Sequence, residues 1–190
     1  MTRKRHLAAL LLLLGTAACA REAEPQPARI VEPRVSSVPP RRGPALLRTV
    51  MLDRQNAARG AVGVAPLAWS DALAASAAAY AQELARTGRF AHAAQPQGPA
   101  RQGENLWTGT HLAYSYDEMV GAWVAERRDF VNEATPGFSR TGRWQDVGHY
   151  TQIIWRGTTA VGCALASNRT DDYLVCRYAP AGNVWGQRAF

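Results

Sequence analysis

The sequence is poor in lysine, in cysteine and in long apolar runs. Lys4 is the only lysine among 22 basic residues, and three cysteines occur in 190 residues. The apolar runs are shorter than the roughly 18 residues that a membrane-spanning helix needs, which argues against an integral membrane protein. The positive charge is spread along the chain without a basic run, so the sequence indicates no nucleic-acid partner.

Two kinds of catalytic motif are also missing. The chain contains no H-E-x-x-H or other dense spacing of metal ligands, and no G-x-S-x-G nucleophile elbow. The composition is still that of a globular protein, because 47% of the residues are hydrophobic and 19% are charged. We therefore expect the chain to fold. None of these motifs assigns a catalytic residue to it.

The first 20 residues are typical of an export signal. A basic start precedes an apolar run over residues 7–14, and small residues follow. Residues 17–19 resemble the end of a bacterial lipobox, although Thr16 stands where that pattern usually has leucine. We therefore expect a lipid-modified Cys19 in a bacterial exported protein, held at the membrane outside the cytoplasm. The alternative is ordinary cleavage after Ala20, which yields a secreted protein.

Residues 21–44 are predicted to form a proline-rich tether. They hold six prolines, several charges and few large apolar side chains, so they cannot bury enough surface to fold by themselves. Residues 45–190 then form one domain, which is long enough to build a core. Removal of the signal lowers the net charge from +7 to +4, because three basic residues and no acid lie in it.

Hydrophobic periodicity predicts three helices in this domain. They cover residues 45–59, 71–87 and 116–131. Ser70 and Gly88 are typical caps for the second helix, and Ser115 and Glu118 have the spacing of a capping box for the third. Capping residues therefore mark both ends of the second helix and the start of the third.

Two strands are predicted near the C-terminus, over residues 160–166 and 173–178, with a polar turn between them. Helices early in the chain and strands late indicate the α+β class. Export would leave Cys163 and Cys176 in an oxidising compartment, where a disulfide can persist. We expect this bond to join neighbouring strands of the hairpin.

Glu126 interrupts an apolar stripe in the third predicted helix. Met119, Trp123 and Phe130 surround it at steps of three and four residues. A carboxylate in such a stripe is expected to be partly buried and to need a partner. An edge position that reaches solvent is the alternative.

Four sequence segments occur together in a characteristic order. They are Gly103-Glu104-Asn105-Leu106, Trp123-x-x-Glu126, Gly148-His149-Tyr150-Thr151-Gln152-x-x-Trp155, and the stretch from Tyr173 to Asn183. On these residues the chain resembles the CAP (or SCP) superfamily, which includes plant pathogenesis-related class 1 proteins, over essentially all of 45–190. Asn56 and Arg59 match the family's opening HN-x-x-R segment, with Gln55 in place of its histidine. The resemblance implies a three-layer α-β-α sandwich.

The resemblance also implies a cleft lined by two histidines and two acids. These are His92, Glu104, Glu126 and His149, of which His92 is the loosest match because Ala93 replaces the family's serine. Such a set suits a divalent cation, zinc or magnesium, with His92 and His149 as ligands. It equally suits metal-free pairs in which each glutamate orients one histidine, or a purely structural role.

Two classes of function follow from the resemblance. The first is a binding module for a small lipid or sterol-like ligand, a divalent metal or a cell-surface partner. Phe130, Phe138 and Trp144 could then line an apolar groove or cover the cleft. The second is a metal-assisted hydrolase, such as a peptidase, that acts through the same cleft. We favour the binding module and leave catalysis unassigned, because resemblance fixes fold better than activity.

Overall fold

The structure is a computed structural model that describes residues 38–96 and 98–190. The predicted signal, Cys19 and most of the predicted tether lie outside these residues. The elements in chain order are α1 (Pro44–Gly60), β1 (Ala68–Trp69), α2 (Asp71–Thr87), β2 (Gly103–Thr110), α3 (Tyr116–Ala125), η1 (Glu126–Asp129), η2 (Trp144–Val147), α4 (Gly148–Ile153), β3 (Ala160–Ser167) and β4 (Asp171–Ala179), of which η1 and η2 are 3-10 helices.

One four-stranded sheet lies at the centre of the domain, in the order β1-β3-β4-β2. Strand β1 pairs with β3 in parallel, and the remaining neighbours are antiparallel. Both β3 and β4 confirm the predicted C-terminal hairpin. Strand β2 was not predicted, and it forms one edge of the sheet.

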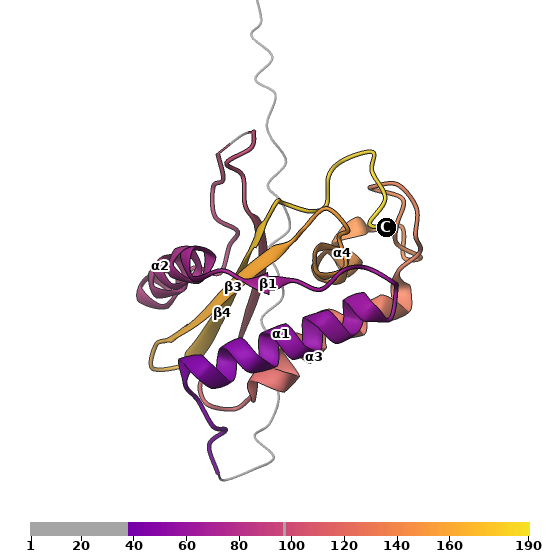
Figure 1. The fold of residues 1–190 in the computed structure, drawn as a ribbon. Helices are drawn as coiled ribbons and strands as arrows, with labels where there is room; N and C mark the ends of the chain where they lie inside the picture. Colours follow the sequence, from indigo (N-terminus) through magenta and orange to yellow (C-terminus); the bar gives the residue numbers. More distant parts are fainter. Residues whose placement is uncertain (1–37, 97) are drawn as a thin grey trace, which may run out of the picture.

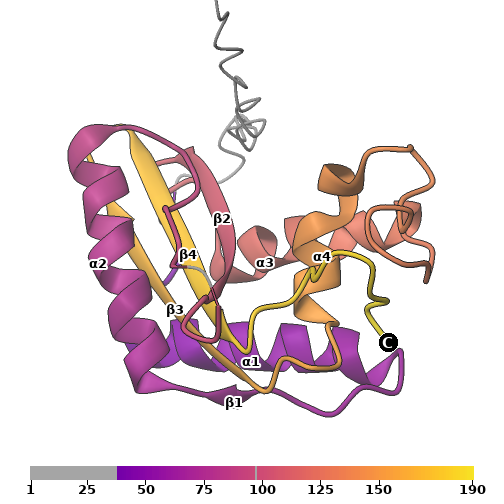
Figure 2. The same ribbon diagram turned by 90° about the horizontal axis from the view of Figure 1, so that it is seen from above.

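Helices cover both faces of the sheet (Figures 1 and 2). Helix α2 packs on one face, and α1, α3 and α4 lie against the other. Because successive side chains of a strand point to opposite faces, Leu106 joins the apolar cluster under α2 while its neighbour Trp107 joins the cluster under the other helices. The predicted three-layer α-β-α sandwich is confirmed.

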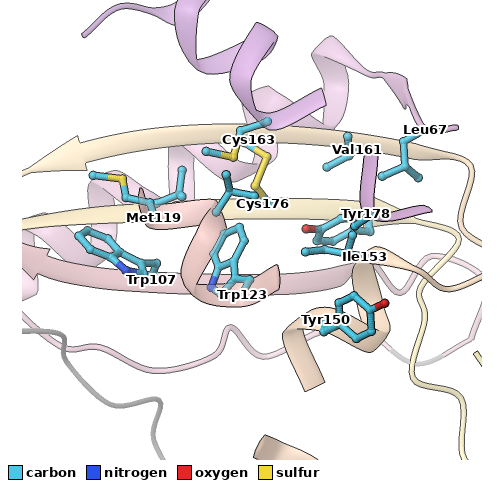
Figure 3. Close-up of a cluster of buried hydrophobic side chains, with 14 of the residues drawn as sticks. Leu67, Trp107, Met119, Trp123, Tyr150, Ile153, Val161, Cys163, Cys176 and Tyr178 are labelled. Carbon is cyan, nitrogen blue, oxygen red and sulfur yellow. A yellow bond between two sulfur atoms is a disulfide. The ribbon is translucent and has the colours of Figure 1, made fainter. Parts of the chain in front are cut away.

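A disulfide crosses the hairpin inside the larger core cluster, as Figure 3 shows. Cys163 and Cys176 are directly opposite each other in the register of β3 and β4. Their Cα atoms are 4.1 Å apart and their sulfur atoms are bonded, which confirms the predicted bridge. Both cysteines are buried, so the bond is shielded from solvent.

The helix caps agree with the sequence, and the end of the third helix does not. Ser70 caps α2, Gly88 ends it in the left-handed region at φ 67°, and the capping box at the start of α3 is complete. Helix α3, however, ends at Ala125 rather than near residue 131. Phe130 continues the apolar pattern but has extended backbone, and its ring packs on Tyr150. The apolar periodicity therefore extends beyond the end of the helix.

Arg59 joins the end of α1 to the end of α4 and the segment that follows it. Its side chain is 1% exposed, and its guanidinium donates to four backbone carbonyl groups. These belong to Ala65, Ile153, Trp155 and Thr158. Burial lowers the pKa of Arg59, yet the carbonyl oxygens satisfy its donors. The segment that matches the family's opening HN-x-x-R therefore has a structural role in this chain, because its arginine holds the end of α1 in place.

A salt bridge to a buried carboxylate fixes the chain where it enters the domain. Arg42 Nη2 lies 2.9 Å from Oδ2 of Asp172, a carboxylate that is fully buried. Asp172 also accepts from His111 Nδ1 and from the Leu112 amide. Because Asp172 is opposite Gly109 in the sheet register, this anchor lies near the C-terminal end of β2.

Candidate functional site

The first of two histidine–glutamate pairs forms at the start of β2. Nδ1 of His92 is 2.6 Å from Oε1 of Glu104, and the Ala93 amide donates to the same oxygen at 3.1 Å. The Glu104 side chain is only 5% exposed, whereas that of His92 is 35% exposed. The carboxylate is therefore a buried support, and the imidazole that it orients reaches solvent.

A buried arginine supports this first pair from the neighbouring strand. Arg177 is opposite Glu104 in the β2–β4 register, and its Nη2 lies 2.8 Å from Glu104 Oε2. The guanidinium also lies 5.2 Å from the ring centre of Tyr80, whose hydroxyl donates to the Ala91 carbonyl beside His92. Burial lowers the pKa of Arg177, and the charge of Glu104 opposes this effect.

The second pair forms where α3 ends and α4 begins. Nδ1 of His149 lies 2.6 Å from Oε1 of Glu126. Oε2 of Glu126 accepts from the backbone amides of His149 and Tyr150, at 3.0 Å each. The His149 ring stacks on Trp123, with centroids 5.8 Å apart and an interplanar angle of 19°. Both side chains of the pair are about one-fifth exposed.

The expectation for Glu126 was right about its partner and wrong about its place. It is partly buried and paired with a histidine, as predicted. It does not lie in the interior of a helix, because α3 ends one residue before it and η1 begins at it. The end of the helix leaves the side chain directed at the first amides of α4, a geometry that an apolar stripe does not reveal.

Asn105 places the two pairs beside each other. Its Nδ2 donates to the carbonyl oxygen of His149 and to the Tyr178 hydroxyl, at 3.1 Å each. Asn105 directly follows Glu104 in β2, so consecutive residues of the edge strand hold the two histidine segments. All four predicted site residues are therefore brought to the same end of β2.

The geometry leaves one nitrogen free for chemistry on each imidazole. Each Nδ1 is bonded to a carboxylate, so each Nε2 is the atom that can bind an ion or accept a proton. The carboxylates are engaged by histidine, backbone amides and Arg177. Within residues 38–96 and 98–190, no three histidine, cysteine or acidic side chains gather as a ligand group for a metal. A cation at this site would therefore have the two Nε2 atoms as its protein ligands, with the glutamates orienting the rings.

A separate cavity of about 350 Å³ lies between α1 and α3. Small residues dominate its lining, which consists of Arg54, Ala57, Ala58, Ala61, Gly121, Val124, Ala125, Arg127 and Tyr150. The sequence did not predict it, although alanines spaced along one side of α1 are a signal for it. Of the three aromatic residues that could line a groove or cover the cleft, Phe138 is fully buried, so it lies in the protein interior rather than at an open surface.

Two residues that complete the site were missed by sequence reasoning. Arg177 had a signal, since it is a charged residue within an otherwise apolar strand and a buried charge needs a partner. Asn105 had a weaker one, because it lies within one of the characteristic segments but carries no charge. Neither could be assigned to a histidine without the register of β2 and β4.

Comparison with known proteins agrees with the fold. Residues 52–178 match the model of the cysteine-rich secretory protein family, CAP. The chain belongs to this family. A PR-1 type pathogenesis-related protein of Sambucus nigra is 38% identical over 143 residues, which cover 73% of this chain and 79% of that protein. Pathogenesis-related protein 1C of Nicotiana tabacum is 36% identical over 140 residues, covering 73% and 78%.

Solved structures share the fold at lower identity. NaASP2, solved with Zn²⁺, has a TM-score of 0.61 and 24% identity, and the match covers 76% of this chain and 84% of that one. BmVAL-1 has a TM-score of 0.59 and 20% identity, covering 80% and 84%. These likenesses support the architecture.

None of the helices in residues 38–96 and 98–190 combines the length and the apolar character that a membrane crossing requires.

Proposed function

We propose that the protein is an exported binding module whose cleft binds a divalent cation through Nε2 of His92 and Nε2 of His149. The observation that carries this proposal is that both imidazoles are oriented by a carboxylate at Nδ1 and are partly exposed. Histidine ligands of metal ions commonly donate their other ring nitrogen to a carboxylate in this way. Binding here needs no rearrangement of the glutamates.

Zinc is the cation that this ligand set favours over magnesium. Imidazole nitrogen is a common zinc ligand, whereas magnesium prefers oxygen ligands and retains its water. The two carboxylates are already bonded to protein donors, which leaves nitrogen as the available ligand type. The zinc in the solved structure of NaASP2 is in keeping with this preference.

Calorimetric titration of the purified protein with Zn²⁺ tests the cation site. We expect wild-type protein to bind one ion, and His92→Ala and His149→Ala each to lose at least about 10-fold in affinity, because each removes a ligand. Binding should weaken as the pH falls, since only neutral imidazole coordinates a metal. His111→Ala is the matched control, because that histidine also pairs with a carboxylate but lies at the anchor near Asp172. Unchanged affinity in both cleft variants would refute the site.

The cavity between α1 and α3 favours a second binding function, for a small single-chain lipid. Its volume of about 350 Å³ is near the lower end of the range for ligand pockets. The alanines and Gly121 give it an apolar lining, while Arg127 provides positive charge and Arg54 pairs with Asp117 at 2.9 Å. This combination suits an acyl chain with an anionic head group rather than a bulky sterol.

Filling the cavity tests lipid binding. A Cβ atom at Gly121 would meet only Arg54 Nη2, at 3.9 Å, so Gly121→Leu can place a side chain in the cavity without a backbone clash. We expect this variant to lose binding of a fluorescent fatty acid. Ala79→Leu, at an exposed position of α2 on the other side of the sheet, should bind as the wild type does. Equal binding by both variants would place the lipid elsewhere.

A metal-assisted hydrolase that uses the same cleft is the alternative function. It requires turnover by the zinc-loaded protein, which a pure binding module does not show. Peptide cleavage that is lost in His149→Ala and kept in His111→Ala would establish the enzyme. Zinc binding without turnover of a broad peptide library would support the module.

We also propose that Cys19 carries a lipid anchor outside the cytoplasm. The signal-like first 20 residues and the small residues before Cys19 support this assignment. Mass spectrometry of the membrane fraction should then show a diacyl-modified N-terminus that begins at Cys19. A soluble protein that begins at Arg21 would mean ordinary secretion instead.

A further inference from the structure

We infer that Asn105 is a positioning residue that sets where His149 stands relative to His92. This inference rests on the proposed cation site, because the spacing of two ligands matters only if one ion binds both. It concerns the carbonyl contact of Asn105, which does not touch the imidazole. The residue acts through the backbone of α4.

The position of Asn105 in the sheet makes it a rigid reference point. Its side chain is 1% exposed, and β2 is paired along its whole length with β4. The amide nitrogen is shared by the His149 carbonyl and by the hydroxyl of Tyr178, which is itself fully buried. Buried amide donors with two partners have little freedom to turn.

The two histidines depend on neighbouring residues of this strand. Glu104 holds His92 through its carboxylate, on the α2 side of the sheet where Arg177 and Tyr80 lie. Asn105 holds the His149 carbonyl on the opposite side, because successive residues of a strand alternate between faces. The two ligand segments thus approach the edge strand from its two faces, and the dipeptide fixes the separation between them.

Other contacts keep α4 folded when the Asn105 contact is removed. Asn183 donates to the Gly148 carbonyl at 2.8 Å, and Glu126 accepts from the first amides of the helix. Loss of the amide at position 105 therefore shifts α4 against β2 rather than unfolding it. The expected consequence is a displaced His149 ring and an unchanged His92 ring.

The test compares Asn105→Leu with Thr108→Val in purified protein. Both remove a buried side-chain hydrogen bond from β2 to a backbone carbonyl, but Thr108 bonds to Asp172 at the anchor. NMR spectra of the histidine rings without metal should show shifted His149 signals in Asn105→Leu, with His92 and His111 unmoved. Zinc affinity should fall about 10-fold in Asn105→Leu, as for other residues that orient a metal ligand, and should stay within about twofold in Thr108→Val.

Unmoved His149 signals in Asn105→Leu would overturn the inference. If that variant does not fold, Asn105→Ser provides the same test with a smaller polar side chain that cannot reach the carbonyl. Failure of wild-type protein to bind zinc would refute the proposed cation site alone. A shifted His149 ring in that case would still establish that Asn105 positions it.

Discussion

Glu104 and Glu126 hold their histidines by different means. Glu104 is held by the guanidinium of Arg177, so that a buried positive charge faces its buried negative one. Glu126 is held by two backbone amides at the start of α4. The first pair therefore depends on another side chain, whereas the second depends on the fold of a short helix.

This difference predicts unequal costs for the two members of the second pair. We expect Glu126→Ala to lower the free energy of unfolding by about 1–3 kcal/mol, because it leaves buried amide donors without an acceptor. His149→Ala should cost less, since Glu126 keeps both amide partners. Urea denaturation of the two variants measures the order, and a larger loss in His149→Ala would show that the imidazole, rather than the amides, secures Glu126.

Arg59 carries the largest expected effect of any single side chain. Arg59→Met keeps the apolar stem but removes the donor that four carbonyl groups share, at a cost of about 1–3 kcal/mol for each carbonyl left unsatisfied. The Trp155 carbonyl keeps the Thr158 amide as a donor. The measurement is denaturant unfolding of the variant. Arg48→Met is the control, because Arg48 lies on the same helix and is exposed. Equal stabilities of the two variants would contradict the structural role of Arg59.

At the residue scale, the sequence predicted the histidines and glutamates of the candidate site, but it did not predict the residues that hold them in place. The family resemblance implied a site of His92, Glu104, Glu126 and His149, and the structure arranges these four residues as two pairs. Asn105 and Arg177 could not be assigned to these pairs, because their partners lie on other elements and only the sheet register brings them together. The Glu126 expectation reached the right partner from a helical pattern that the backbone does not follow.

At the scale of elements, local signals located three helices and missed strands β1 and β2. The caps at Ser70, Gly88 and Ser115 work through hydrogen bonds within a few residues, so they can be recognised in sequence. Strand β2 depends on pairing with β4, which follows about 70 residues later in the chain. Its mixture of polar and apolar residues gave no clear period, and the edge of the sheet was therefore missed.

The capping box of α3 predicts a pH dependence. The amide and the hydroxyl of Ser115 bond to the Glu118 carboxylate and lower its pKa. A lowered pKa in the folded state means that the charge stabilises the protein above the ordinary glutamate range. This contribution is lost as the pH falls through the folded-state value.

Glu118→Gln tests this element, because glutamine keeps the acceptor and removes the charge. We expect the variant to be less stable by about 0.3–1 kcal/mol at neutral pH and low salt, and equal to the wild type at a pH below the lowered pKa of Glu118. Thermal unfolding across acidic pH measures the difference. A gap that persists unchanged in acid would show that the charge is not its source.

At the scale of the whole molecule, one covalent bond joins the two central strands. Loss of the disulfide in the double variant Cys163→Ala/Cys176→Ala should cost about 2–4 kcal/mol, chiefly because the unfolded chain gains freedom. Denaturation of wild-type protein with and without reductant provides the comparison. Since the sulfur atoms are buried in the core, a reductant should act only after partial unfolding. A double variant as stable as the wild type would contradict this role.

The salt bridge between Arg42 and Asp172 places the entry of the chain at the C-terminal end of β2. We call this end of the domain the near pole and the end at the start of β2 the far pole. The chain joins the domain beside Asp172, which is opposite Gly109, whereas the histidine pairs lie around Glu104 and Asn105. Five residues of strand separate these levels, a distance of about 17 Å. A surface that holds the leader ahead of Arg42 thus meets the near pole first. Under the proposed anchoring at Cys19, the histidine pairs at the far pole then face away from the membrane, where a diffusing ion or ligand arrives without passing between the domain and its support.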